Sequence, residues 1–253
     1  MRHQTESADR NVLTLENGRM VILESTAADR TNTEALAELA RQGKEEGYAL
    51  FTECEQNHLG TDDAPGLSLS ILVRPGIHAQ KAGMLSAITA VAVSRAVERI
   101  ADIDVRIRWV NDLFCGTRKL AVMMTNARIT PNGFLDYAVI GISMALPHEY
   151  FKPKLGDIVT QVFSGDIQPL GVRLTEHILE EFFLIYDKMT TDSSYMQEYR
   201  TRSMVLGSRV RVLVGSTYVR GRVSAIDDNA HLVVELRKGQ TCVIDSPSKV
   251  LFR

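Results

Sequence analysis

Cysteine is scarce in this sequence, which holds three among its 253 residues: Cys54, Cys115 and Cys242. They lie far apart and form no Cys-x-x-Cys pair, so the chain offers neither a zinc knuckle nor a disulfide framework. This usage favours a reducing, cytoplasmic setting.

Neither sign of charge dominates, because 29 Lys and Arg face 31 Asp and Glu, a formal net charge of −2. That balance disfavours a general polyanion binder and a polybasic membrane patch. No segment reaches the about 20 apolar residues of a membrane span, and the polar start lacks the apolar run of a secretory signal. The stretch before Val12 is also too short for a helix-turn-helix module. We therefore expect no membrane and no nucleic acid among the partners.

The sequence does contain 45% hydrophobic residues, enough for one or two buried cores. Apolar periodicity and turn residues predict a hairpin, several longer strands and four helices. The hairpin falls at 12–23, the strands at 48–53, 67–75, 105–110, 120–129 and 134–146, and the helices at 31–43, 79–100, 174–189 and 194–203. A mixed sheet with helices packed on it, an α/β (α+β) fold, is the natural assembly.

The first helix, at 31–43, has clear boundary signals. Thr31 or Asn32 can cap its N-terminus, and Gly43 can end it. Its buried face is predicted to hold Ala35, Leu36 and Leu39.

The pattern changes after residue 205. Leu206-Gly207 ends the last helix, and short alternating strands separated by Gly, Asp-Asp-Asn and Lys-Gly-Gln turns follow. This pattern is typical of a small all-β barrel. We therefore expect two domains, 1–205 and 206–253.

The stretch RWVNDLFCGTRKLAV, from Arg108 to Val122, places a carboxylate and a lysine seven residues apart. Lys119 can bind a phosphate or stabilise developing negative charge, or it can simply solvate a turn together with Arg118. Asp112 can act as a general base or a metal ligand, or merely cap the turn.

Other candidate residues carry weaker signals. Gly141, in YAVIGISMAL, can let a ligand approach a strand closely or can mark a bulge. His58 with Asp62 and Asp63 resembles a metal site only superficially, so no metal site is predicted from the residues. The Met123-Met124 pair is predicted to fill core volume. Walker-type phosphate loops and Gly-x-Ser-x-Gly elbows are missing.

RWVNDLFCGTRKLAV resembles the Lys-Trp-Pro/Val-Asn-Asp…Lys-Lys-Leu/Val-Ala/Cys-Gly signature of biotin protein ligases, the biotin–[acetyl-CoA-carboxylase] ligase family. TNTEALAELARQGKEEG resembles that family's Ser-Thr-Asn helix. Glu55-Gln56 resembles the end of the family's second strand, and AVIGISMAL resembles its Val-Ile-Gly-Ile-Gly-Ile-Asn strand. YRTRSMVLGSRVRV and the β module resemble its C-terminal barrel. The resemblance runs from Val12 to Arg253 and fits the single-function class, which lacks a DNA-binding domain.

The resemblance implies an enzyme that joins biotin to ATP, with Mg²⁺, and passes the biotinyl group to a lysine of a biotin carboxyl carrier domain. A homodimer formed through the sheet is a further possibility that it implies. The residue roles carried over are catalysis for Lys119 and Asp112, nucleotide binding for Asn111, Asp112 and Lys119, and biotin binding for Thr31, Asn32, Gln56, Lys119 and Gly141.

The sequence departs from the family pattern at several positions. The family's arginine-rich loop should follow Gln56, where this chain has NHLGTDDAPG with no arginine and two aspartates. Val122 stands where the family has Gly, so a branched side chain is expected to intrude on the biotin slot. Ser143 and Ala145 replace a Gly and an Asn, and Asn126 replaces a Glu.

Three functions are therefore open from the sequence. The first is a working ATP-dependent biotin protein ligase with an unusual loop. The second is a ligase-fold protein that no longer adenylates biotin and acts as a binding or regulatory partner. The third is an acyl-transfer enzyme for another small carboxylic acid, such as lipoate or a medium-chain acid. Fold alone does not decide among them, because function resides in the site.

Overall fold

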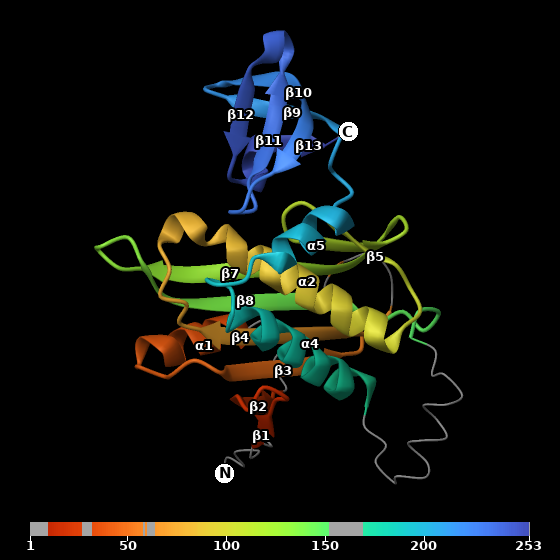
Figure 1. The fold of residues 1–253 in the computed structure, drawn as a ribbon. Helices are drawn as coiled ribbons and strands as arrows, with labels where there is room; N and C mark the ends of the chain where they lie inside the picture. The colour runs from red at the N-terminus through yellow and green to blue at the C-terminus, as the bar shows by residue number, and fades with distance from the viewer. Residues whose placement is uncertain (1–9, 27–31, 58, 60–63, 152–168, 253) are drawn as a thin grey trace, which may run out of the picture.

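The computed structural model describes residues 10–26, 32–57, 59, 64–151 and 169–252. Thr31, His58, Asp62 and Asp63 lie outside the described residues, so the structure does not address the predictions that fall on them. The described chain forms a large mixed sheet with packed helices and a second, smaller antiparallel sheet (Figure 1). This confirms the expected α+β fold class. Within the described part of the chain, no helix is both long and apolar enough to cross a membrane.

The large sheet has eight strands in the order β1-β2-β3-β4-β8-β7-β6-β5. Strands β2 and β3 pair in parallel, and the other neighbours pair antiparallel. The strands are β1 (Arg10–Thr14), β2 (Met20–Ser25), β3 (Tyr48–Cys54), β4 (Gly66–Val73), β5 (Val105–Arg108), β6 (Asp112–Cys115), β7 (Arg118–Ile129) and β8 (Leu135–Ala145). The predicted Asn17-Gly18 hairpin is present, and Gly18 takes the positive φ of 81° that the turn requires.

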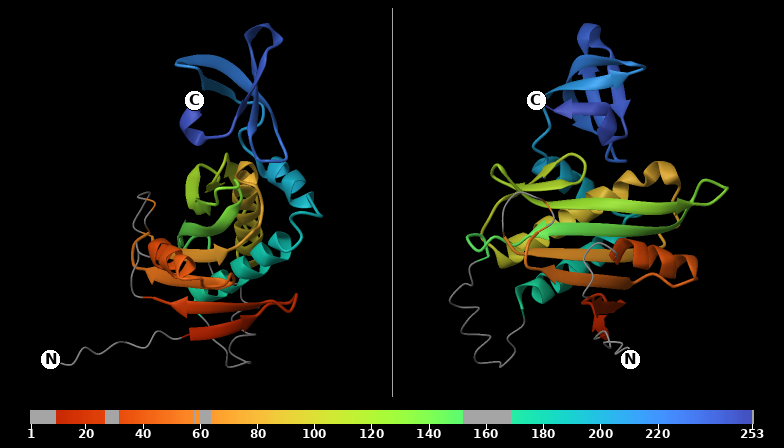
Figure 2. Two further views of the ribbon diagram at one scale, coloured as in Figure 1. Left: turned by 90° about the vertical axis from the view of Figure 1, so that its left-hand side faces the viewer. Right: turned by 180° about the vertical axis from the view of Figure 1, so that it is seen from behind.

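Helices cover both faces of this sheet (Figure 2). One face carries α2 (Gly83–Ile100), preceded by η1 (Ala79–Lys81), together with α4 (Leu170–Tyr186) and α5 (Ser194–Arg202). Among the helices that the structure describes, α1 (Asn32–Arg41) is the one on the opposite face. Helix α2 is apolar almost all round and buried along most of its length, as its sequence predicts.

The two faces hold separate cores. Ile140, Ile142 and Met144 of β8 point into the large core with α2 and α4, whereas Tyr137 and Val139 belong to the small core under α1. This is the alternation expected of a strand that is covered on both faces.

The buried face of α1 differs from the prediction. Leu36 is buried as expected, but Ala35 is exposed, and Ala37 and Ala40 complete the buried face. Because alanine side chains are short, this face lets α1 lie close to the sheet.

The small sheet contains β9 (Arg209–Val214), β10 (Thr217–Ile226), β11 (Leu232–Leu236), β12 (Thr241–Ile244) and β13 (Val250–Phe252). Its order is β12-β11-β10-β9-β13, and η2 (Arg237–Gly239) and η3 (Pro247–Lys249) lie in its connections. The short alternating strands predicted after residue 205 are therefore present. The 1–205/206–253 domain division stays a prediction.

Several predicted boundaries were wrong, including that of the helix predicted at 174–189, which runs from Leu170 to Tyr186, and two of the errors lie near β5. The strand predicted at 105–110 ends at Arg108, and Trp109 and Val110 form a turn. The last helix ends at Arg202 rather than at Leu206-Gly207, and Met204 N–H then bonds Ile107 O at 2.9 Å beside β5. In both cases long-range pairing takes over from local helix or strand preference.

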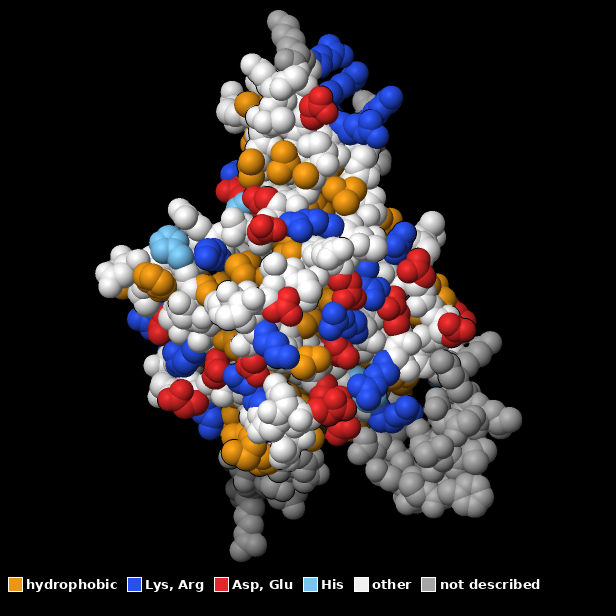
Figure 3. All heavy atoms as spheres, viewed as in Figure 1, with side chains coloured by type: hydrophobic (Ala, Val, Ile, Leu, Met, Phe, Trp, Pro, Cys, Tyr) orange, Lys and Arg blue, Asp and Glu red, His pale blue; other side chains and the backbone are white. Residues whose placement is uncertain are grey.

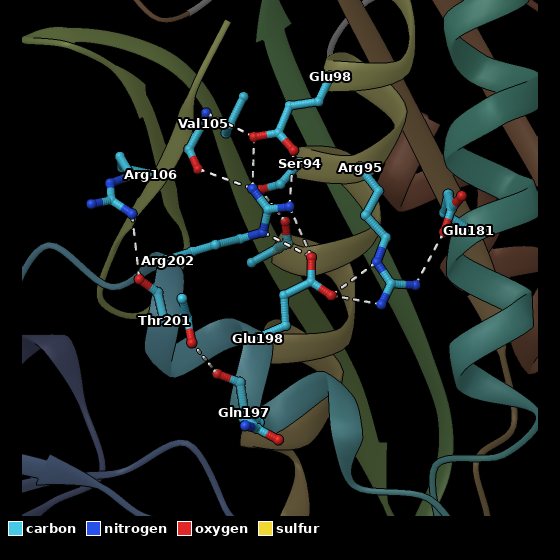
Figure 4. A network of polar contacts seen from close by, with 11 residues as sticks. Ser94, Arg95, Glu98, Val105, Arg106, Glu181, Gln197, Glu198, Thr201 and Arg202 are labelled. Atoms are coloured by element: carbon cyan, nitrogen blue, oxygen red, sulfur yellow. Dashed lines mark hydrogen bonds and ion pairs between the residues drawn. The ribbon is translucent and has the colours of Figure 1, made fainter.

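A network of ion pairs fixes α5 against α2 and β5 (Figure 4). Arg202 pairs with Glu98 at 2.7 Å and with Glu198 at 2.8 Å, and Arg95 pairs with Glu198 at 2.6 Å. The Val105 N–H donates to Glu98 Oε1 at 3.0 Å. The network thereby ties the edge strand β5 to the helix that leads into the small sheet.

Candidate functional site

A row of side chains crosses five strands on the face that carries α1. Strand register places Thr52 of β3 opposite Ser68 of β4, and Ser68 opposite Ser143 of β8. Ser143 in turn lies opposite Val122 of β7, which lies opposite Asp112 of β6. We call these five residues the cross-strand row; it spans four strand spacings, about 19 Å.

Asn32 lies at the β3 end of the cross-strand row, at the N-terminus of α1. Its side chain is 2% exposed. Thr26 Oγ1 donates to Asn32 Oδ1 at 2.8 Å, and Asn32 Nδ2 donates to Thr52 Oγ1 at 3.1 Å. Thr52 Oγ1 also lies 2.9 Å from the Thr26 carbonyl oxygen. The amide therefore binds the start of α1 to the end of the row, a satisfied buried cluster.

Gly141 lies in the neighbouring row, paired regularly with Ser70 and Met124, so it is not a bulge. A Cβ added to Gly141 would lie 2.9 Å from Thr33 Oγ1, and Thr33 Oγ1 is 3.0 Å from Ser70 Oγ. The glycine thus admits the first turn of α1 to the sheet. The sequence predicted that Gly141 could let a ligand approach the strand closely, but in the structure α1 of the same chain lies at this position.

At the β6 end of the row, Lys119 Nζ lies 2.9 Å from Asp112 Oδ2. The lysine and aspartate side chains are 29% and 22% exposed. A bulge follows Leu113, so that Phe114 pairs with Lys119 while Leu113 pairs with Ala121. Bulges redirect side chains, and this one places Lys119 beside Asp112. The two residues that the sequence separates by seven positions meet in one ion pair.

Arg118 does not join this pair. Its guanidinium forms an ion pair with Glu149 and lies 5.7 Å from the centroid of the Tyr150 ring. A hydrogen bond from its own backbone N–H, and then Arg118, hold the pKa of Glu149 below its ordinary value. Arg118 and Lys119 therefore each have an acidic partner of their own. Two residues that only solvate a turn would not need such partners.

Asn111 supports Asp112 from the preceding turn. Its side-chain amide donates to Met123 O, and Met123 N–H donates to Asn111 O at 2.9 Å. Tyr199 Oη donates to Val110 O at 3.0 Å. The predicted nucleotide ligand Asn111 thus uses an amide N–H to hold the turn against β7.

Gln56 is exposed in a bend after β3. Among the residues that the structure describes, no hydrogen bond joins the Gln56 side chain to the cross-strand row. Its neighbour Asn57 is buried and donates from both its backbone N–H and its Nδ2 to Ala64 O, each at 2.9 Å. Asn57 closes the base of this loop, a role that the sequence did not reveal.

The two methionines after Val122 face opposite sides of β7. Met123 is buried in the large core as predicted, but Met124 is 70% exposed on the α1 face. The prediction that both fill core volume was therefore wrong for Met124, because adjacent strand residues point to opposite faces. Val122 and Met124 give this side of the site its apolar surface.

A cavity of about 320 Å³ continues the site toward the small sheet. Arg108, directly opposite Asp112, lines it together with Phe114, which is opposite Lys119, and Phe252 of β13. The Arg108 guanidinium lies 5.3 Å from the Phe252 ring centroid. Sequence reasoning missed these residues because Phe252 is distant in the chain.

The site has few groups suited to hold a metal alone. Among the described residues, no three His, Cys, Asp or Glu side chains gather as a metal site. Asp112 is the carboxylate of the cross-strand row. Mg²⁺ commonly binds through one or two carboxylates together with substrate phosphates, so Asp112 suits an ion that arrives with a nucleotide.

Comparison with known proteins shows which family this chain resembles. Residues 48–144 match the Biotin/lipoate A/B protein ligase family. The bifunctional ligase/repressor BirA of Bacillus spizizenii is 29% identical over 217 residues, 80% of this chain and 66% of its own length. The biotin–[acetyl-CoA-carboxylase] ligase of Mycobacterium tuberculosis is 25% identical over 238 residues, 88% of this chain and 86% of its own length.

Solved structures show the same fold. The biotin protein ligase of Aquifex aeolicus in complex with biotin and ATP superposes with a TM-score of 0.63, at 17% identity, over 91% of this chain and 99% of that one. A biotin protein ligase-like protein of unknown function from a Silicibacter species superposes with a TM-score of 0.66, at 16% identity. That match covers 88% of this chain and 94% of the Silicibacter chain. The matched part spans just under two thirds of the BirA relative and most of the mycobacterial one. Residues 48–144 thus match the biotin/lipoate A/B protein ligase family, and the relatives and solved structures that this chain resembles include biotin protein ligases.

Proposed function

We propose that the protein activates biotin with ATP and attaches the biotinyl group to a lysine of a biotin carboxyl carrier domain. The observation that carries this proposal is the Lys119–Asp112 ion pair at one end of a row whose other end is the buried Asn32–Thr52 pair. An elongated acid fits between a polar end and a cationic end. We place the reaction in the cytoplasm, in keeping with three free cysteines.

The acid would lie along the cross-strand row. The ureido head group of biotin has both N–H donors and a carbonyl acceptor, which match the hydroxyls of Ser68 and Ser143 beside the satisfied Asn32–Thr52 pair. The alkyl chain would cross Val122, and its carboxylate would meet Lys119. Asn32 would position the head-group end by holding Thr52, while Thr31 and Gln56 stay proposed contacts from the adjoining segments.

The nucleotide would occupy the cavity at Arg108, Phe114 and Phe252. Aromatic rings suit a base, and the Arg108 guanidinium suits a phosphate. Register places Arg108 opposite Asp112 and Phe114 opposite Lys119. The acid and the nucleotide would therefore meet beside Lys119, where the new bond forms.

The first step joins the two substrates. A carboxylate oxygen of biotin attacks the α-phosphorus of ATP, and the bond to pyrophosphate breaks, leaving biotinyl-adenylate. The Lys119 ammonium offsets negative charge that develops on the transferring phosphoryl group, an effect strongest in a site arranged beforehand. Mg²⁺ bound with the ATP phosphates would supply further charge neutralisation, with Asp112 as the available carboxylate.

The second step releases AMP. The carrier lysine, as a neutral amine, attacks the acyl carbon; a C–N bond forms and the bond to the AMP oxygen breaks. The amine nitrogen then loses a proton, and Asp112 is placed to accept it. Lys119, freed from Asp112 by this transfer, stays beside the departing phosphate.

A second candidate is adenylation of a slimmer acid, such as lipoate or a medium-chain acid. The observation that favours it is Val122, whose branched side chain is half-buried in the middle of the row. Exposed Met124 adds apolar surface beside it. A straight alkyl chain passes a branched side chain more easily than a fused ring system does.

The test is a mass measurement on a purified carrier domain after incubation with the protein, ATP and one acid at a time. Biotin should add its acyl mass, and Lys119→Ala should abolish the gain. Lys249→Ala, which removes an exposed lysine on the small sheet, is the matched control and should leave the gain intact. A gain with lipoate or octanoate alone would favour the second candidate. Carrier binding without any gain would instead identify a binding protein.

A further inference from the structure

Four arginines form a square array on the outer face of the small sheet. Strand register places Arg211 of β9 directly opposite Arg220 of β10, and Arg209 directly opposite Arg222. All four side chains are exposed, while Val210 and Val212 between them are buried. We call Arg209, Arg211, Arg220 and Arg222 the arginine ladder.

The ladder borders an open groove of about 630 Å³. Arg209, Arg220 and Arg222 line it, joined by Arg237 from η2 and by Glu235 of β11. Lys and Arg side chains gather on one flank of the small sheet, away from the large sheet (Figure 3). Volumes of this size are typical of ligand sites.

Within the described residues the guanidinium groups of the ladder form no ion pair, although strand register places Glu235 of β11 opposite Arg222. No ion pair joins Arg209, Arg220 or Arg237 to any residue in the described chain. Arg222 Nε donates to the Gly207 carbonyl at 3.0 Å, and the Arg211 guanidinium lies 5.5 Å from the centroid of the Tyr218 ring. This contrasts with Arg95 and Arg202 of the large domain, which each contact two carboxylates.

Protection of sheet edges does not explain this arrangement. Charged residues often guard edge strands against pairing with other molecules. Here the edge strands are β12 and β13, and the ladder lies on β9 and β10, which each have two partners. Like charges directly opposite each other destabilise an antiparallel pair. A bound anion would offset that repulsion.

Charge is also divided unevenly along the chain. Residues 206–253 hold eight Lys and Arg against four Asp and Glu, a formal charge of +4, although the whole chain carries −2. Asp227, Asp228 and Asp245 pair with His231, Arg200 and Lys249, so Glu235 is the acidic residue at the groove. The expectation of no nucleic-acid partner rested on the short stretch before Val12 and on the net charge of the whole chain, and that net charge conceals this division.

We propose that the groove binds consecutive phosphates, as found in a single-stranded nucleic acid or a free oligophosphate. Arginine forks match phosphate oxygens, and several in one groove suit a ligand with repeated charges. An acidic protein fits less well, because protein interfaces centre on apolar anchors and exclude charge from their core. Phosphate-binding interfaces are instead polar and strongly positive.

The test uses the full chain and a fluorescently labelled oligothymidylate, with tripolyphosphate as a competitor. Four phosphate contacts predict roughly fiftyfold weaker binding of the oligonucleotide when salt rises from about 50 to about 200 mM. Arg209→Gln/Arg220→Gln should lower the salt dependence to roughly half, since two contacts are lost. Arg128→Gln/Lys249→Gln removes two charges outside the groove and should change neither.

Several results would overturn the proposal: no binding of either probe at low salt, equal weakening in the control variant, or equally strong binding of polyglutamate. Competition by tripolyphosphate would identify a free oligophosphate as a sufficient ligand, and its failure would identify a nucleic-acid strand. Without ligand, Arg209→Gln/Arg220→Gln should melt no lower than the parent protein, because repulsion is relieved. A clear fall in melting temperature would mean that the arginines hold the fold, and would also refute the proposal.

Discussion

Trp109, in the turn that precedes Asp112, donates a hydrogen bond from its indole Nε1 to the carbonyl oxygen of Ala230, in the loop between β10 and β11 of the small sheet, at 2.6 Å. Both residues are buried. Arg200 of α5 holds the same loop, donating from Nε to Ile226 O at 2.8 Å. The β10–β11 loop of the small sheet therefore supports the turn that leads into Asp112, one half of the proposed catalytic pair.

Trp109→Phe should destabilise the protein by about 1–3 kcal/mol, because the buried Ala230 carbonyl loses its donor. Loss of ring volume adds to the effect. Urea denaturation measures it, and Tyr218→Phe, an exposed aromatic change on the small sheet, should stay within about 0.5 kcal/mol of the parent. Equal stability of Trp109→Phe and the parent would show that this bond does not hold the two parts together.

Gly141→Ala tests whether the glycine serves helix packing. An added Cβ would lie 2.9 Å from Thr33 Oγ1, so the variant should lose about 1–3 kcal/mol of stability. Thr33→Ala removes the obstructing hydroxyl. The double variant should therefore be less destabilised than the sum of the single changes, as a double-mutant cycle measures. If the stability losses of the two single variants instead add up, Gly141 is not needed for contact with Thr33, and its role would be to admit a ligand.

Lowering the pH should reduce the free energy of unfolding, in part through protonation of Glu198. Burial alone would raise the pKa of Glu198, but hydrogen bonds and ion pairs from Arg95 and Arg202 hold it below the ordinary 4.5. Because the pKa of Glu198 is lower in the folded state, its ionised carboxylate stabilises the fold fully at pH values above the ordinary pKa. That stabilisation is lost as the pH falls through the lowered folded-state pKa.

The measurement of this effect is the urea midpoint as a function of pH. Glu198→Gln should be less stable than the parent near neutral pH, with a smaller further loss in acid. Glu34→Gln, which removes an exposed carboxylate with no ion pair in the described chain, is the control and should follow the parent curve. Parallel curves for Glu198→Gln and the parent would contradict the assignment.

Local signals predicted the elements of the fold well. The Asn17-Gly18 hairpin and the buried helix α2 follow from turn chemistry and apolar periodicity within about 20 residues. The meeting of Lys119 and Asp112 was also foreseeable, since a short hairpin joins them. Only the bulge after Leu113, which aims the lysine, carries no sequence signature.

Long-range register set what the sequence could not predict. Thr52, Ser68 and Ser143 form one row only because β3, β4 and β8 are neighbours, although β8 follows β4 by more than 60 residues. The Arg108–Phe252 contact and the arginine ladder likewise depend on pairing that no single segment specifies. Alternation in RVRVLV indicated a strand, but not that its arginines face those of the next strand.

Val122→Gly should decide how the middle of the cross-strand row selects its acid. Removing the branched side chain widens the slot at the position between Ser143 and Asp112. Each methylene that obstructs a pocket changes discrimination by roughly tenfold or more, so biotin should bind at least about tenfold tighter to Val122→Gly. Calorimetric titration measures this, with lipoate as the comparison acid and Val219→Gly in the small sheet as a control for strand loosening. If biotin binds the parent and Val122→Gly equally, Val122 does not narrow the slot, and the slimmer-acid candidate loses the observation on which it depends.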